Sequence, residues 1–209
     1  MAETLGTLQV GRMLDGAVAQ IRQHHEMLSR LDAAVGDGDH GTTILRTMEA
    51  VARTVAEQPA GDLQQFFSKI AWEVMSCDGG STGPLLGALF MGMSEAGAGK
   101  TELDRAGLVA LLEGGILKLH KQSRAEIGDK TMMDAFLPAL AALRASDPAC
   151  SIKSTLHLAA EAATTGAEAT KTMRAKYGRA RNLGDRVIGH PDPGAVSASL
   201  ILRGFSEGV

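Results

Sequence analysis

The chain has 209 residues, 44% of them hydrophobic and 22% charged, which is ordinary for one globular domain. A net charge of −3 and an aromatic content of 3% argue against a broad nucleic-acid or anionic-membrane surface. No apolar run approaches the roughly 20 residues of a membrane span, and the first residues lack the pattern of a signal peptide. We therefore expect a cytoplasmic protein with neither nucleic-acid nor membrane partners.

Apolar residues recur at helical spacing along almost the whole chain, and convincing two-residue alternation is absent. We expect Thr101 to cap the fifth helix, with Glu102 and Asp104 in its first turn, and Pro138 to kink the sixth. No domain boundary is visible, so residues 1–209 are predicted to form a single domain. The predicted helices span about 8–31, 43–56, 63–75, 83–96, 101–122, 130–145, 154–174 and 193–204.

The glycine-rich connections follow the odd-numbered predicted helices, over residues 35–43, 77–84, 125–131 and 178–195. Short connections favour antiparallel neighbours, and thus an all-α, up-and-down bundle or ring of eight helices. In such an arrangement all four connections lie at one end, where the even-numbered helices begin. Free N–H groups and positive dipole ends would converge there, which predicts a phosphate site.

The first of these connections is rich in acids. Asp32, Asp37 and Asp39 offer several hard oxygen ligands, which Mg²⁺ favours. Gly36 and Gly38 allow the backbone to curl so that the carboxylates meet. The alternative is that one aspartate caps the second helix while the others are solvated.

The second connection, "CDGGSTGP", combines glycines with hydroxyl side chains. Gly79 and Gly80 permit close backbone approach, and Ser81 and Thr82 could bind phosphate. A plain glycine-rich helix connection is the alternative interpretation.

The last connection carries both basic and rigid segments. Arg179 and Arg181 could clamp phosphates, although a solvated basic loop would have the same composition. "HPDPGA" places Asp192 at the N-cap of the last helix, before Pro193.

Taken in order, the segments "LDAAVGDGDHGTT", "GGSTGPLLG", "GDKTMMDAFLPAL" and "GRARNLGDRVIGHPDPGA" resemble the nucleotide-binding L subunit of dihydroxyacetone kinase. The same module forms the C-terminal domain of single-chain dihydroxyacetone kinases. The resemblance covers essentially the whole chain. It implies an eight-helix antiparallel barrel with the nucleotide at one end.

The resemblance also implies roles for individual residues. Asp32, Asp37 and Asp39 would bind two Mg²⁺ ions that bridge the phosphates of ATP or of a tightly bound ADP. Family members often carry a glycine-lysine pair where this chain has Ser123 and Arg124, and these two are therefore left out of the expected site. The expected nucleotide contacts, with Met132 in the adenine pocket, are His40, Gly41, Thr42, Thr43, Gly80, Ser81, Thr82, Met132, Arg179, Asp192 and Pro193.

The function implied is a phosphotransferase subunit acting on an alcohol group. It would donate the phosphoryl group to dihydroxyacetone, or another short ketose, held on a separate K-type subunit. The phosphoryl source, ATP or a phosphocarrier (M-type) subunit, stays open, as do the ketose and the formation of a homodimer. The alternative is a non-enzymatic Mg–nucleotide module that regulates a partner; retention of all three aspartates and the phosphate loops favours the kinase.

Overall fold

The computed structural model describes residues 3–57, 62–78 and 80–209, so Gly79 lies outside the described residues. Within these ranges the regular secondary structure is helical apart from one very short strand pair, β1 (Leu5–Gly6) with β2 (Glu102–Leu103). The α-helices are α1 (Thr7–Val35), α2 (His40–Ala56), α3 (Leu63–Met75), α4 (Thr82–Ala96), α5 (Arg105–Ser123), α6 (Met133–Ala145), α7 (Ile152–Ala169) and α8 (Pro193–Glu207). Two 3₁₀ helices, η1 (Thr170–Thr172) and η2 (Arg179–Val187), lie between α7 and α8.

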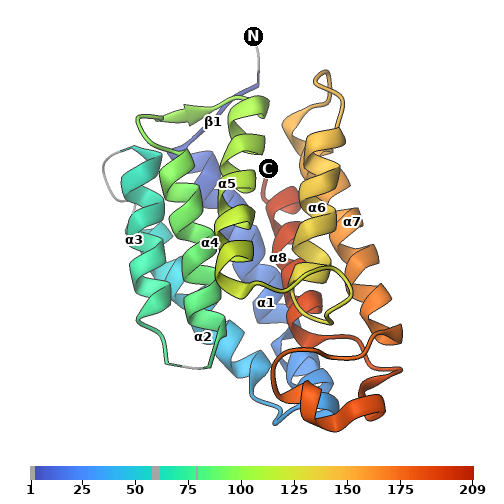
Figure 1. The fold of residues 1–209 in the computed structure, drawn as a ribbon. Helices are drawn as coiled ribbons and strands as arrows, with labels where there is room; N and C mark the ends of the chain where they lie inside the picture. The colour runs from blue at the N-terminus through green and yellow to red at the C-terminus, as the bar shows by residue number, and fades with distance from the viewer. Residues whose placement is uncertain (1–2, 58–61, 79) are drawn as a thin grey trace.

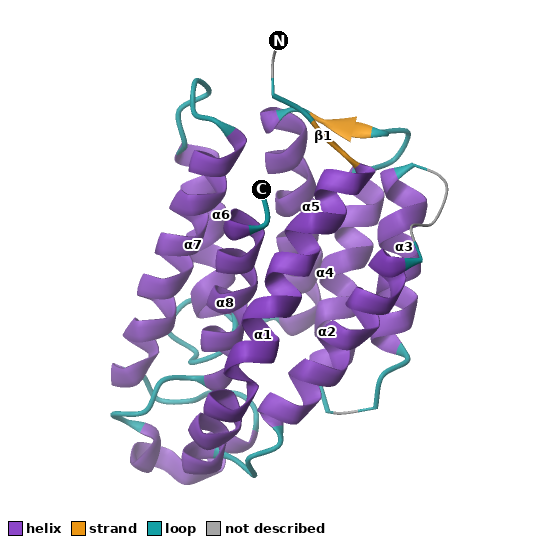
Figure 2. Ribbon diagram, turned by 180° about the vertical axis from the view of Figure 1, so that it is seen from behind, coloured by secondary structure: helices purple, strands orange, loops and turns teal. Residues whose placement is uncertain are grey.

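The α-helices form a closed ring. Each packs against its neighbours in chain order, and α8 packs back against α1 (Figure 1). The view from behind shows α1 between α8 and α2 (Figure 2). Inward faces supply a continuous apolar core that includes Phe67, Phe90, Phe136 and Phe205. The predicted eight-helix antiparallel barrel is confirmed. None of the helices in the described part of the chain is long and apolar enough to cross a bilayer.

Glycines close the ring between the first and last helices. A Cβ on Gly16 of α1 would lie 2.1 Å from the carbonyl oxygen of Gly204, and a Cβ on Gly204 would lie 2.4 Å from the backbone nitrogen of Ala17. Both separations are far below van der Waals contact, so only glycine lets the two backbones approach this closely. This contact helps bring the start of α8 near the end of α1, where the acidic connection begins.

The start of the fifth helix differs from the prediction. Thr101 does not cap it; the Asp104 side chain accepts a hydrogen bond from the Gly107 N–H at 2.7 Å, and α5 begins at Arg105. Glu102 lies in β2, where it pairs with Gly6, rather than in a first helical turn. Strand pairing keeps this segment extended and moves the cap three residues along the chain.

Other helix ends also shift. The sixth helix begins at Met133 rather than Lys130, because Lys130 has φ +59° and cannot continue a right-handed helix. The helix continues unbroken through Pro138 to Ala145. The seventh helix ends at Ala169, before η1, and not near residue 174.

Candidate functional site

A cavity of about 660 Å³ lies at the end of the barrel where α2, α4, α6 and α8 begin. Its walls include Asp37, Ser81, Thr131 and Arg179, one residue from each glycine-rich connection. The prediction that these four connections meet at one end is therefore confirmed. Four helix N-termini surround this space, and their positive dipole ends favour an anionic ligand.

Most of the expected site residues line this cavity: Asp32, Asp37, Asp39, His40, Thr43, Gly80, Ser81, Thr82, Met132, Arg179, Asp192 and Pro193. Gly41 and Thr42 do not line it. A Cβ on Gly41 would lie 1.9 Å from the carbonyl oxygen of His25, so Gly41 allows the first turn of α2 to pack closely on α1. Thr42 is exposed on the outside of that turn.

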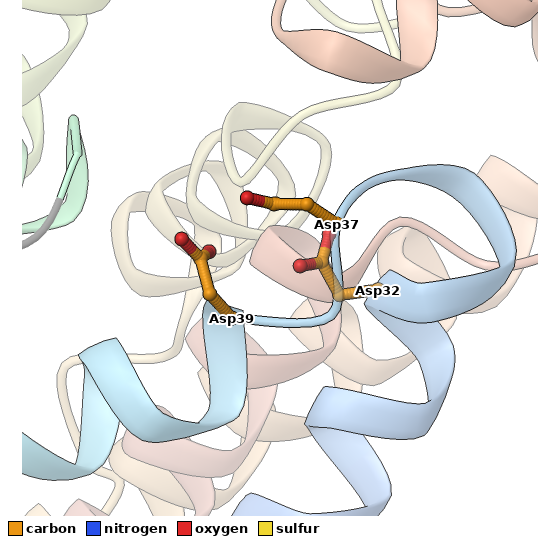
Figure 3. A group of neighbouring side chains, drawn as sticks. All are labelled: Asp32, Asp37 and Asp39. Atoms are coloured by element: carbon orange, nitrogen blue, oxygen red, sulfur yellow. The ribbon is translucent and has the colours of Figure 1, made fainter.

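The three aspartates face a common space (Figure 3). Asp32 lies in the last turn of α1, whereas Asp37 and Asp39 lie in the connection to α2, and one oxygen from each lies within 4.8 Å of the others. Carboxylates this close repel one another unless a cation lies between them. Their hard oxygen atoms suit Mg²⁺, so the donor set fits the expected metal.

The capping alternative holds in part, because one aspartate does bond to the start of α2, but it is not the aspartate at the N-cap. Asp39 occupies the N-cap of α2, yet its side chain makes no capping hydrogen bond. Asp32 instead accepts a hydrogen bond from the His40 N–H through Oδ2, at 3.1 Å. The carboxylate of Asp39 thus remains available to a ligand.

Arg179 lies against the acidic cluster. Its Nη1 contacts Oδ2 of Asp37 and lies 3.6 Å from Oδ2 of Asp39. The guanidinium offsets part of the clustered negative charge. Because the Arg179 side chain is 62% exposed, we expect water to weaken this attraction.

The start of α8 contributes a second acidic position. Asp192 accepts a hydrogen bond from the Ala195 N–H at 2.7 Å, which makes it the predicted N-cap. Burial raises the pKa of Asp192 to about 7, although this hydrogen bond and the nearby Lys130 ammonium act in the opposite direction. Asp192 is therefore a carboxyl group that changes charge near neutral pH.

His40 connects α2 to α8. Its Nε2 lies 3.0 Å from the hydroxyl oxygen of Ser197. Burial lowers the pKa of His40 below its usual value, against the opposing charge of Asp32. The neutral imidazole is thereby favoured beside the cavity.

Several cavity residues were missed by the sequence reasoning. Gln122, Ser123 and Tyr177 line the wall, and Ser123 belongs to the pair that had been left out of the expected site. Lys130 also lines it, although its side chain is only 2% exposed overall. The "GDKTM" segment was the one available sign that Lys130 belongs to the site. No local pattern in the sequence shows that Lys130 is buried.

The loop before α6 is organised by Asp134. Its two carboxylate oxygens accept hydrogen bonds from the N–H groups of Gly128, at 2.6 Å, and Thr131, at 2.7 Å. These bonds hold the loop in one conformation and place Met132 at the cavity wall.

The fold and cavity define a helical barrel domain with an acidic cavity at the end where four helices begin. The chain belongs to the DAK2 domain family, whose sequence model matches residues 34–207.

Similar curated proteins agree with this assignment. The ADP-binding subunit DhaL of PEP-dependent dihydroxyacetone kinase 1 from Listeria innocua is 34% identical over 196 residues, which cover 94% of this chain and 93% of that protein. The corresponding subunit from Escherichia coli is 33% identical over 85% of each chain. Human triokinase/FMN cyclase is 35% identical over 87% of this chain, but only 32% of that longer protein is covered.

A solved structure shares the fold. The dihydroxyacetone kinase from C. freundii in complex with AMP-PNP and Mg²⁺ matches with a TM-score of 0.74 and 27% sequence identity. The match covers all of this chain and 35% of that one. This chain thus spans about a third of the length of that solved enzyme.

Proposed function

We propose that this chain is the nucleotide- and Mg²⁺-binding subunit of a cytoplasmic dihydroxyacetone-type kinase. It donates a phosphoryl group to a short ketose that a separate K-type subunit holds. The observation that carries the proposal is the convergence of three carboxylates and four helix N-termini on one cavity. This arrangement supplies both the cation ligands and the N–H donors that a polyphosphate requires.

The proposed roles follow from the position of each group. Asp32, Asp37 and Asp39 hold Mg²⁺, in our proposal two ions, which would neutralise phosphate oxygens when bound. Ser81 and Thr82, which line the same cavity at the start of α4, donate hydrogen bonds to phosphate oxygens.

The remaining wall suits the base and ribose of a nucleotide. Met132 and Pro193 supply apolar surface, and Asp192 adds a polar group beside them. The cavity of about 660 Å³ lies within the range of ordinary small-ligand sites, roughly 300–1,000 Å³. We assign this space to the nucleotide and place the ketose on the partner subunit.

The names of the relatives support the assignment of nucleotide binding to one subunit of a larger kinase. Two of them carry names that specify an ADP-binding subunit of a PEP-dependent kinase. Another, from Lactococcus lactis, is named as the subunit of a PTS-dependent kinase. We therefore include a phosphocarrier among the partners to be tested, alongside direct use of ATP.

The decisive experiment reconstitutes the chain with a K-type subunit and dihydroxyacetone. One arm receives Mg·ATP and the other receives ADP with a phosphocarrier extract and phosphoenolpyruvate. We expect dihydroxyacetone phosphate in at least one arm, and its loss with Asp37→Ala at unchanged helical content by circular dichroism. Magnesium-dependent nucleotide binding without turnover, across a panel of partners and ketoses, would instead indicate the regulatory module.

A further inference from the structure

The segment of residues 173–189, here called the strap, connects η1 to the loop before α8 and includes η2. It runs across the lower end of the barrel in Figure 1, close to the end of α1. Tyr177, Gly178, Arg179 and Ala180 in the strap line the cavity. Its placement therefore decides where these groups lie relative to a bound ligand.

The two ends of the strap are joined to each other. The Gly189 N–H donates to the carbonyl oxygen of Lys171 at 2.7 Å, and the Asp192 N–H donates to Oγ1 of Thr170 at 2.8 Å. These bonds make a narrow neck where the chain leaves α7 and returns to α8.

Lys130 spans this neck from a third segment. Its Nζ donates to the carbonyl oxygens of Thr170 and His190, both at 2.5 Å, one on each side of the neck. The Lys130 side chain is 2% exposed, so water cannot readily replace these bonds. A buried ammonium group is costly unless its donors are satisfied, and two of the three are satisfied here.

The backbone at Lys130 also indicates a constrained position. Its φ of +59° is uncommon for a residue other than glycine. The loop that holds it is fixed by Asp134 through Thr131, the next residue. This conformation directs a long side chain back into the barrel wall, where its Nζ reaches the neck.

Further contacts dock the strap onto the loop before α6. The Lys176 N–H donates to the carbonyl oxygen of Asp129 at 3.1 Å, and its Nζ lies 2.5 Å from Oδ1 of Asp129. The Tyr177 hydroxyl donates to the carbonyl oxygen of Arg124 at 3.3 Å. The strap side chains in these outer contacts, Lys176 and Tyr177, are exposed, whereas the Lys130 ammonium is buried at the neck. We therefore take the Lys130 bonds as the firmest attachment.

We infer that Lys130 is a positioning residue that clamps the neck of the strap and thereby holds Arg179 over the acidic cluster. The clamp acts on the conformation of the strap and does not require Lys130 to touch the ligand. The consequence for nucleotide binding rests on the proposed function, whereas the clamp itself can be tested without any ligand.

The test is hydrogen exchange, measured by mass spectrometry on the full chain, with Lys130→Met and Lys130→Gln. Methionine keeps the apolar stem and removes every donor, and glutamine keeps two N–H donors on a slightly shorter side chain. Lys69→Met is the matched control, because the Lys69 ammonium pairs with Glu57 on the surface. The informative amides are those of Lys176 and Gly189, whose hydrogen bonds depend on a docked strap.

In Lys130→Met we expect the strap peptides to exchange at least tenfold faster, because a hydrogen bond from a charged donor shifts an equilibrium by about that factor. Peptides from α1 and α4 should keep wild-type rates. Lys130→Gln should recover part of the protection, and Lys69→Met should match the wild type. The dissociation constant for Mg·ADP should rise several-fold in Lys130→Met.

Unchanged strap exchange in Lys130→Met, or faster exchange spread evenly over all helices, would overturn the clamp. If Lys130→Met does not fold, Lys130→Gln carries the test; failure of both to fold would assign Lys130 to global stability and overturn the proposal. If the wild type binds no Mg·ADP, the proposed function fails, while the exchange result still decides the clamp.

Discussion

Replacing Asp37 with Asn separates the metal-binding role of the acidic cluster from its contribution to folding. Two unit charges 4 Å apart interact by about 4 kcal/mol at an effective dielectric constant of 20. The Asp37 and Asp39 side chains are 45% and 60% exposed, and Arg179 lies against them, so solvent and the guanidinium reduce the repulsion strongly. We therefore expect metal-free Asp37→Asn to be as stable as the wild type, or more stable by at most about 1 kcal/mol.

In magnesium the wild type should become more stable than Asp37→Asn. An ion at 100 times its dissociation constant stabilises the native state by about 2.7 kcal/mol. For a chain of this size that corresponds to a rise in Tm of roughly 5–10 °C. Asp37→Asn removes one of the three clustered carboxylates. Magnesium should therefore raise the Tm of this variant by less than about 2 °C at the same concentration.

The assay is thermal unfolding followed by circular dichroism, in EDTA and across a magnesium series. Asp147→Asn is the control, because Asp147 is an exposed acid in the connection between α6 and α7, outside the cluster. It should keep the full magnesium shift. The metal-site reasoning would be refuted if Asp37→Asn kept that shift, or if it lost its helical structure without metal.

The other predictions concern packing and pH. Gly16→Ala should lower the free energy of unfolding by about 1–3 kcal/mol in urea titrations, because the new Cβ would lie 2.1 Å from the Gly204 carbonyl oxygen. Gly11→Ala, on the same helix, meets only Cγ1 of Val55 at 3.3 Å and should be close to neutral; equal losses in both variants would contradict the close-approach argument. Burial raises the pKa of Asp192 from 3.8 to about 7, so the native state binds a proton that the unfolded chain releases. Stability should therefore fall as the pH rises from about 4 to about 7, and Asp192→Asn, which keeps a capping oxygen, should reduce this slope in urea titrations at several pH values.

The helices could be predicted because their signals are local. The bounds of α3, Leu63–Met75, agree with the prediction at both ends. A regular apolar stripe follows Asp62, whose side chain accepts a hydrogen bond from the Gln65 N–H, and the glycine-rich segment comes directly afterwards. The fifth helix was predicted less well, because the pairing of Glu102 with a distant strand overrides the local capping pattern.

Most of the candidate site could also be predicted from the sequence. The acids at 32, 37 and 39 are close in sequence, and short connections between antiparallel helices bring the other loops to the same end. Gly41 was expected to contact the nucleotide but does not line the cavity. It stands within the same motif, but its position is explained by packing against α1 rather than by a place on the cavity wall.

The amino-acid sequence by itself determined the helical class, the order of the helices and the end of the barrel at which acids and glycines gather. Periodicity, capping and loop length act over a few residues, so they can be recognised without coordinates. Only the tertiary structure decided that Lys130 is buried against Thr170 and His190, and that Arg179 lies on the acids. These contacts join residues 40 to 142 positions apart, as from 130 to 170 and from 37 to 179, and no local pattern encodes such a meeting.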